Sequence, residues 1–341
     1  MSISLKIDLQ NLVNNKTKPI GSLGMLEDLA IQLGLIQHTT APQIIQPQII
    51  IFAGDHGIAT TGLVNPFPQA VTAQMVYNFV NGGAAINVFS KQNNIELTVV
   101  DCGVNEDFPT DLPILHYKVN KATKNYLHEN AMSLDEVNIC INNGKKITEL
   151  IVLNKKTNCI GFGEMGISNT SSAALIMHYY LKLPIESCVG IGTGTNNEQL
   201  ITKINTLQQV ANFHQLHHSS NPNDLLCKIG GFEIATMVGS YLKAFEKNLT
   251  IVVDGFITTA ALLVALNIEP KLINNCIFAH CSNEQGHLKM LNHLNATPIL
   301  NLGLRLGEGT GAALAIPILE SACAFINKMA SFESAGVSNK D

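Results

Sequence analysis

The sequence predicts an α/β protein built on a doubly wound, mostly parallel sheet, and three observations lead to this prediction. Short apolar runs recur along the chain, and each ends in glycine or in a polar tip. Continuous apolar runs are typical of strands that helices cover on both faces. Segments with helical periodicity separate the runs, as in parallel sheets. The chain has 341 residues, 46% of them hydrophobic and 14% charged, so it can bury a large core.

Five apolar runs are the expected strands, and each is followed by a tip at its carboxyl end. The runs and tips are Ile49–Ala53 before Gly54-Asp55-His56, Leu97–Val100 before Asp101-Cys102-Gly103, Cys159–Phe162 before Gly163-Glu164, Ile251–Val253 before Asp254-Gly255, and Ile277–Ala279 before His280-Cys281-Ser282. In such sheets ligands bind outside the carboxyl ends of the strands. The tips therefore predict a binding crevice along one edge of the sheet.

The expected helices lie between the strands and at both ends of the chain. Residues Gln69–Phe79 and Glu233–Phe245 each place apolar side chains on one helical face. Residues 1–45 and 312–330 have helical patterns without strands, and we expect them to form a small helical lobe. Residues 46–311 are then the large α/β domain and residues 331–341 a frayed tail. The whole chain, 1–341, is expected to form a single catalytic unit.

Charge and hydropathy exclude several classes of partner. The chain has 21 basic and 26 acidic residues, a formal charge of -5, and no dense run of lysine or arginine. We therefore expect no nucleic-acid partner. The start has no basic stretch before an apolar core, and the most apolar windows, Ile251–Leu266 and Ala312–Ile326, each contain an acidic residue and are short for a bilayer. We expect a cytoplasmic protein without a membrane partner.

Cysteines give no clear sign of a metal site. The eight cysteines are scattered, and several lie within apolar runs, which is typical of reduced, buried thiols. Cys276 and Cys281, with His280 beside the second, come closest to a zinc pattern. No second pair of ligands follows at a suitable spacing. We expect no metal ion.

Glu308 is the first candidate catalytic residue. It lies among three glycines, Gly307, Gly309 and Gly311, between an apolar run and a segment rich in alanine and leucine. Glycines on both sides allow a sharp turn and let a small molecule approach the carboxylate closely. Glu308 could be a general base, or it could cap the following helix, where a carboxylate among free N–H groups is favoured. The segment alone favours neither.

Two glycine-rich segments could hold a phosphate. Gly163–Ser172 follows an expected strand and opens a helix, where backbone donors and hydroxyls suit an anion, although an ordinary Ser/Thr cap would have the same composition. Gly190–Gly194 could form a second wall of the pocket. It does not fit the dinucleotide fingerprint, because Thr195 stands where the third glycine belongs, and the chain has no Walker motif.

Other candidates have equally ordinary structural explanations. Lys203 and Ser282 could contact a phosphate, although a lone lysine on a helix is usually solvated. Asp55-His56 and Asp254, at strand ends, could act as acids or bases, or could simply hold loops in place. Phe67, between two prolines, could stack on a planar ring or stiffen a turn.

Eight short blocks are spread over nearly the whole chain: Lys18–Gly24, Ala53–Gly57, Val71–Met75, Gly82–Asn87, Gly163–Ile167, Asp254–Phe256, Ser282–His287 and Leu306–Gly311. In their order and number, they resemble the nicotinate-nucleotide–dimethylbenzimidazole phosphoribosyltransferase family of cobalamin biosynthesis. The resemblance implies a Rossmann-like sheet with a small helical lobe, a homodimer, and no cofactor. It also implies transfer of the phosphoribosyl group of nicotinate mononucleotide to 5,6-dimethylbenzimidazole, which yields alpha-ribazole 5'-phosphate and nicotinate.

The resemblance also implies roles for individual residues. Glu308 matches the general base of the family. The residues expected around the phosphate and ribose are Glu164, Met165, Gly166, Ile167, Gly190 and Gly192, with Lys203 and Ser282 as further candidates. Phe67, Gln74 and Leu306 are expected near the base.

Two alternatives remain for the activity. The same group could be transferred to another acceptor, such as adenine or a phenolic compound. The chain could instead be a catalytically silent nucleotide sensor, although the presence of Glu308 argues against that function.

Overall fold

The computed structural model describes residues 3–190, 196–218 and 221–338. Its centre is a six-stranded, entirely parallel sheet with the order β3-β2-β1-β4-β5-β6. The strands are β1 (Gln48–Gly54), β2 (Glu96–Gly103), β3 (Leu115–His116), β4 (Cys159–Met165), β5 (Thr250–Val253) and β6 (Cys276–Phe278). This is the strand order of a Rossmann sheet, and the order reverses between β1 and β4. The predicted fold class is confirmed.

Helices cover both faces of the sheet because the strands alternate their side chains between two apolar clusters. In β1, Ile50 and Phe52 face one cluster, whereas Ile49 and Ile51 face the other, and all four are fully buried. The first cluster is covered by α5 (Leu134–Lys155), α6 (Asn169–Leu181), α7 (Asn197–Phe213), α8 (Pro222–Ile229), α9 (Phe232–Glu246), α10 (Phe256–Ile268) and α11 (His287–His293). The second is covered by α1 (Ile3–Asn14), α2 (Met25–Ile36), α3 (Val71–Val80), α4 (Ala85–Gln92) and α12 (Thr310–Lys328).

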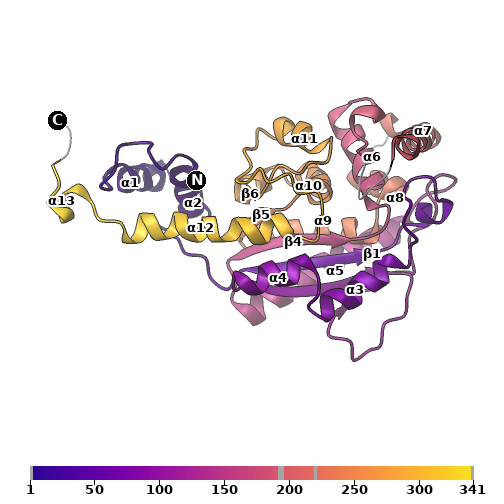
Figure 1. Cartoon of the computed structure of the whole chain (residues 1–341), viewed down its shortest axis with the longest axis horizontal. Coiled ribbons are helices and arrows are strands. Elements are labelled where there is room, and N and C mark those ends of the chain that lie inside the picture. The colour runs from indigo at the N-terminus through magenta and orange to yellow at the C-terminus, as the bar shows by residue number, and fades with distance from the viewer. Residues whose placement is uncertain (1–2, 191–195, 219–220, 339–341) are drawn as a thin grey trace.

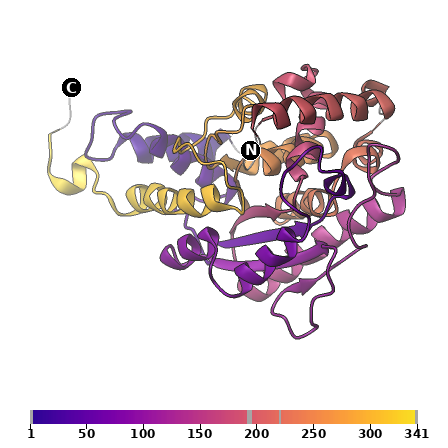
Figure 2. The same ribbon diagram turned by 45° about the vertical axis from the view of Figure 1, so that its right-hand side comes forward.

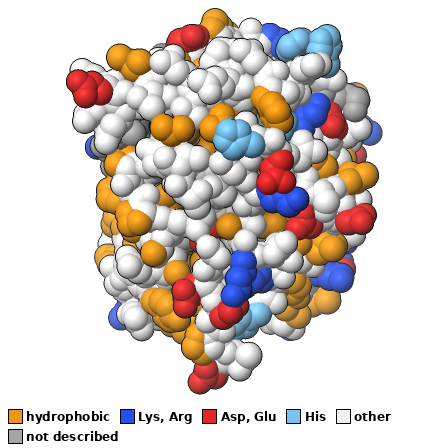
Figure 3. Space-filling view, turned by 90° about the vertical axis from the view of Figure 1, so that its right-hand side faces the viewer, with side chains coloured by type: hydrophobic (Ala, Val, Ile, Leu, Met, Phe, Trp, Pro, Cys, Tyr) orange, Lys and Arg blue, Asp and Glu red, His pale blue; other side chains and the backbone are white. Residues whose placement is uncertain are grey.

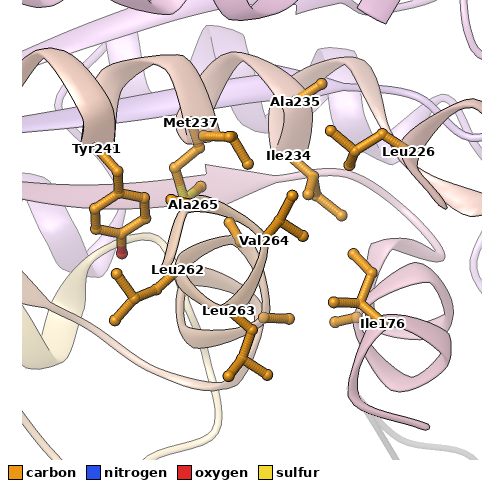
Figure 4. Close-up of a cluster of buried hydrophobic side chains, with 14 of the residues drawn as sticks. Ile176, Leu226, Ile234, Ala235, Met237, Tyr241, Leu262, Leu263, Val264 and Ala265 are labelled. Atoms are coloured by element: carbon orange, nitrogen blue, oxygen red, sulfur yellow. The ribbon is translucent and has the colours of Figure 1, made fainter. Parts of the chain in front are cut away.

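The first cluster fixes α9 and α10 against the sheet. Figure 4 shows Met237 and Tyr241 of α9 facing Leu262 and Ala265 of α10. The ring of Tyr241 also meets Phe162 of β4 edge-on, with ring centroids 4.7 Å apart. This packing holds the helices that follow β4 and β5, which begin at the carboxyl edge of the sheet.

The N- and C-terminal segments form a lobe that projects from the sheet. Figures 1 and 2 show α1, α2 and the outer half of α12 side by side, with α13 (Phe332–Ala335) beyond them. The two ends of the chain are joined by hydrogen bonds from Thr17 N to Ala330 O at 3.0 Å and from Phe332 N to Asn15 O at 3.1 Å. The expected tail is thus wrong for α13, because its backbone is anchored to the N-terminal segment.

Helix α12 belongs to both parts of the molecule. Its first turns pack on β4 and β5, and it also packs on α2 of the lobe. The expected domain boundary at residue 312 therefore falls within a continuous helix.

By length and composition α12 could cross a membrane, but 56% of its most apolar window is buried inside the protein. The sheet and α2 account for its apolar surface.

The face in Figure 3 carries acidic and basic side chains close together, with apolar side chains between them. Several exposed lysines pair with acids, as in Lys124 with Glu129 at 3.1 Å. Mixed charge of this kind is typical of a solvated surface.

Candidate active site

A cavity of about 240 Å³ lies at the carboxyl ends of β4, β5 and β6, beside the point where the strand order reverses. Its lining comes from the tips that follow these strands, from a loop before α12, and from the segment around α3. The lining residues include Glu164–Thr170, Asp254–Thr258, His280, Ser282, Glu284, Arg305–Glu308, Asn65, Phe67, Val71 and Met75. The predicted convergence of strand tips on one crevice is confirmed for these three strands.

Glu308 is held in the cavity wall by a sharply turned loop. Gly307, Glu308 and Gly309 all have left-handed backbone angles, with φ of 86°, 63° and 86°. Glycine adopts this conformation without steric cost, so Gly307 and Gly309 allow the chain to turn sharply on both sides of Glu308. The carbonyl of Glu308 presses on Gly163 of β4, where any β-carbon would overlap it. The loop therefore lies directly on the central sheet.

The Glu308 carboxylate is buried but incompletely bonded. Its side chain lies within the cavity wall, only 5% of the residue is exposed, and Oε2 has no hydrogen-bond partner among the described residues. The pKa of Glu308 is raised to about 7, mainly by burial and also by the neighbouring Asp254, against the lowering effect of the Ile86 backbone N–H. A carboxylate of this kind can accept a proton near neutral pH.

The capping role considered for Glu308 belongs to Asp254. Asp254 Oδ1 accepts a hydrogen bond from Ala312 N in the first turn of α12 at 2.9 Å, and the backbones of Gly309 and Gly311 also donate to this carboxylate. His280 lies on its other side, with Nε2 3.8 Å from Oδ1. Burial raises the pKa of Asp254 despite these partners. The Asp254 carboxylate therefore stabilises the positive end of the α12 dipole, and Glu308 is not needed for that purpose.

Glu164 is a further carboxyl group in the cavity, whose lining also includes Glu284. Its pKa is raised to about 8, mainly by burial and also by the charges of Asp254, Glu233 and Glu308, although Asn169 Nδ2 donates to its Oε2. Gly307 passes so close to Glu164 that a β-carbon there would overlap Oε1. Three mutually repelling carboxyl groups in one cavity favour a ligand that carries positive charge or hydroxyl donors.

Donors for an anion lie around the start of α6, part of which lines the cavity. Lys203 Nζ is 3.1 Å from Thr170 Oγ1 and 3.4 Å from Gly190 O, and only 2% of this lysine is exposed. Burial lowers the pKa of Lys203 to about 8, and Glu284 opposes that shift. The expectation of a solvated lysine is wrong, because the side chain runs inward from α7 toward the predicted phosphate end.

Several residues that were predicted to contact the phosphate line the cavity, but in different ways. Ser282 lines the cavity, and its Oγ accepts from Glu284 N at 3.3 Å. Met165 and Gly166 also line it. The N–H of Ile167, however, already donates to Thr72 Oγ1 at 3.1 Å, so Ile167 contributes a wall and not a free donor. Gly192 lies outside the described residues.

An apolar wall lies near Glu308 and suits a planar ring. Phe67 and Leu306 line the cavity while remaining 44% and 50% exposed, and Val71 and Met75 of α3 complete the wall. Gln74, on the same helix, is exposed and is not among the described lining residues. Val71 and Met75 line the cavity from this helix, whereas Gln74 is exposed to solvent.

Asp55 and His56 lie at the tip of β1 and hold the structure behind the cavity. His56 is completely buried, and its Nε2 lies 2.6 Å from Glu233 Oε1 in the first turn of α9. Asp55 Oδ2 accepts from Asn105 N at 2.8 Å. These contacts tie loops and helix starts together, which favours the structural role considered for this pair.

Sequence reasoning missed Arg305 and Glu284, which both line the cavity. A signal for Arg305 was present, because it is the single arginine of the chain and lies three residues before Glu308. Asn169 was not among the predicted site residues, although it bonds directly to Glu164. No group of three or more His, Cys, Asp or Glu side chains in the described ranges is arranged to hold a metal ion.

Comparisons with known proteins agree over nearly the whole chain. A family model described as "Phosphoribosyltransferase" matches residues 2–337. The chain is similar to the nicotinate-nucleotide–dimethylbenzimidazole phosphoribosyltransferase of a Janthinobacterium species, with 48% identity over 99% of this chain and 97% of that protein. It is 49% identical to the protein of the same name from Photobacterium profundum, over 96% and 95% of the two chains. The crystal structure of CobT from Thermus thermophilus matches with a TM-score of 0.94 and 36% identity, over 99% of this chain and 100% of that one.

Proposed function

This chain belongs to the phosphoribosyltransferase family of those relatives, and from that premise we propose that it transfers the phosphoribosyl group of nicotinate mononucleotide to 5,6-dimethylbenzimidazole. The products are alpha-ribazole 5'-phosphate and nicotinate, and the reaction belongs to cobalamin biosynthesis. The observation that carries the catalytic role of the cavity is the Glu308 carboxylate, with its pKa of about 7 and one oxygen without a partner among the described residues.

The chemistry explains why a base is needed and an acid is not. The pyridinium nitrogen of nicotinate mononucleotide is positively charged, and it becomes neutral when its bond to the anomeric carbon breaks. One ring nitrogen of the benzimidazole attacks that carbon with its lone pair, and the N–H of the other becomes acidic as positive charge builds up. We assign Glu308 to take this proton. Such assistance typically contributes ~10²–10⁴-fold, and alignment of the two rings and the ribose supplies much of the rest.

The other carboxyl groups suit the ribose and the transition state. Positive charge develops on the sugar as the pyridine leaves, and Asp254 and Glu164 lie in the same cavity as Glu308. Their electrostatic effect on Glu308 and on each other supports this placement. An ionised carboxylate near the developing positive charge stabilises the transition state without solvent reorganisation. Glu164, with a pKa of about 8, is mostly protonated at neutral pH and can donate a hydrogen bond to a ribose hydroxyl.

We place the phosphate near the start of α6 and Lys203. A helix N-terminus attracts anions, and Lys203 adds a nearby ammonium group that Thr170 and Gly190 hold in place. A monophosphate held in this way needs no bridging metal ion. The attachment fixes the nucleotide away from the bond that breaks.

Purified protein mixed with nicotinate mononucleotide and dimethylbenzimidazole should release nicotinate. Adenine and a phenolic compound, supplied side by side, compare the acceptors directly, and we expect dimethylbenzimidazole to give the highest kcat/KM. Absence of product with every acceptor would exclude the transferase activity.

We also propose that the enzyme is a homodimer that works in the cytoplasm. The projecting lobe supports the first part, because Ile3, Ile7 and Ile20 are 81%, 54% and 75% exposed on it. All eight cysteines are free thiols, and this suits a reducing compartment.

A further inference from the structure

Arg305 is an unusual residue in this chain. The protein has 21 basic side chains, and all but Arg305 are lysines. Arg305 also lines the cavity, three residues before Glu308. No lysine and no other arginine occurs among the described lining residues. The one permanent planar cation of the chain therefore lies at the catalytic end of the cavity.

The backbone that carries Arg305 is fixed on both sides. Leu304 O accepts a hydrogen bond from Asn283 N at 2.8 Å, which ties the loop to the segment after β6. On the other side, the carbonyl of Glu308 presses on Gly163 of the central sheet. Arg305 itself is exposed. A long side chain on a held backbone can reach a ligand without moving the loop.

The surrounding charge is unfavourable for an anionic ring. Glu164, Asp254 and Glu308 all lie in this cavity. A carboxylate on a ligand at this end would be repelled unless a cation offset the charge. Lys203 is held at a different place, because its Nζ contacts Thr170 Oγ1 and Gly190 O near the proposed phosphate position. Arg305 is the cation placed to offset it.

We propose that Arg305 binds the carboxylate on the pyridine ring of nicotinate mononucleotide, and that it thereby makes the enzyme select the acid over the corresponding amide. This proposal rests on the transferase function above. A guanidinium group matches a carboxylate with two parallel hydrogen bonds and keeps its charge when partly desolvated. It has five N–H donors, so a contact made in the unliganded protein leaves donors for the ligand. After the transfer, the same contact holds the departing nicotinate anion.

Two ligands separate this role from general binding. Nicotinamide mononucleotide has the same ribose and phosphate as nicotinate mononucleotide, but it carries an uncharged amide in place of the carboxylate. Dissociation constants for both, measured by calorimetry without an acceptor, should favour the acid in the wild-type protein. Arg305→Met should weaken binding of the acid at least about tenfold, the size of a lost charge-assisted pair. Binding of the amide should change by less than about threefold. Arg305→Lys should fall between, because it keeps the charge and loses the paired geometry.

Lys203→Met provides the matched comparison. Its predicted partner, the phosphate, is present in both ligands, so both should bind more weakly by a similar factor. Thermal unfolding should show that the Arg305 variants remain folded, since the residue is exposed. If Arg305→Met were unstable, the acid-to-amide ratio of Arg305→Lys would decide.

An equal loss for both ligands in the Arg305 variants, or no loss, would overturn the assignment. Wild-type turnover of nicotinate mononucleotide is measured in parallel. Failure of that reaction contradicts the proposed function itself, whereas normal turnover with an unchanged acid-to-amide ratio contradicts only the role of Arg305.

Discussion

Glu308 combines two properties that rarely occur together in one side chain. It is buried deeply enough for its pKa to rise to about 7, yet it still lines an open cavity with one oxygen unpartnered by any described residue. Asp254 makes this possible, because it supplies the carboxylate that the start of α12 would otherwise take from Glu308. The structural and the catalytic carboxylate are therefore different residues.

Replacement of Glu308 by glutamine should abolish most of the turnover. The amide has nearly the same shape but cannot accept the proton, so we expect kcat to fall by ~10²–10⁴-fold. Binding of nicotinate mononucleotide, measured by calorimetry, should change little. Glu320→Gln makes the same change in charge at an exposed position of α12 and should leave kcat unaltered. Wild-type rates in the Glu308 variant would remove this residue as the base.

The pH profile should show the same group. The base must be ionised, and the pKa of Glu308 lies near 7. The value of kcat/KM should therefore rise with pH up to about 7 and then level off. The substrate phosphate also titrates, so the binding constant is measured at each pH to separate the two effects. A flat profile between about pH 5.5 and about 8 would contradict an ionising base with this pKa.

Among the elements, the loop before α12 and strand β4 depend on one close contact. A methyl group at Gly163 would overlap the carbonyl of Glu308, so Gly163→Ala should push the loop away from the sheet. A displacement of about 1 Å at a catalytic group can cost ~100-fold, and we expect kcat to fall by at least about tenfold. Steady-state kinetics measures this.

Gly303→Ala serves as the control for that variant. It lies in the same loop with φ of 68° and has no neighbour within 4 Å, so alanine there costs about 1 kcal/mol of backbone strain without pressing on Glu308. Its kcat should stay near the wild-type value. Equal activity in the two variants would show that the Gly163 contact does not position Glu308.

The tip of β1 and the start of α9 are joined by the buried pair of His56 and Glu233. Both side chains are completely buried, and Ser172 of α6 contacts the other ring nitrogen of His56 at 3.3 Å. Glu233→Ala leaves that network without its acceptor, so the free energy of unfolding should fall by about 3 kcal/mol. Urea denaturation measures it. Glu246→Ala, which removes an exposed partner of Lys243 on the same helix, should cost under about 1 kcal/mol; a similar loss in both would contradict the role of the buried pair.

The sequence predicted the elements that carry strong periodicity and missed those that do not. Five apolar runs correspond to five strands, and the helices expected at Gln69–Phe79 and Glu233–Phe245 appear at Val71–Val80 and Phe232–Glu246. Strand β3 was missed because it has only two residues and pairs at the edge of the sheet. Helix α13 was missed because its order comes from contacts with residues far away in the sequence.

For the molecule as a whole, the sequence predicted where the site lies better than what each residue does there. The tips after β4, β5 and β6 converge because parallel strands end at one edge. Whether a given side chain faces the cavity depends on tertiary contacts, which periodicity does not reveal. Gln74 turns outward, the N–H of Ile167 is taken by Thr72, and Lys203 is buried. The fact that Asp254, and not Glu308, caps the start of α12 also depends on a contact between residues far apart in the sequence.

The proposed dimer is a property of the whole molecule. Sedimentation equilibrium should give a mass about twice the 36.8 kDa of one chain. Ile3 and Ile7 lie one turn apart on α1 and are highly exposed, so replacing both with glutamate should shift the mass toward that of one chain. Leu153→Glu on α5, where the side chain is 68% exposed, should leave the mass unchanged. A wild-type mass of a single chain would contradict the dimer.

Because α12 packs on both the sheet and the helical lobe, its position has a consequence for folding during synthesis. This helix covers one face of the central strands and carries the Glu308 loop at its start, yet it is synthesised after all six strands. Until then, Ile49 and Ile51 of β1 lack one cover of their apolar face. We expect a nascent chain that stops before residue 304 to be inactive and to associate with chaperones, because exposed sheet faces aggregate during synthesis. Packing of α12 onto the sheet and completion of the catalytic centre are then a single event.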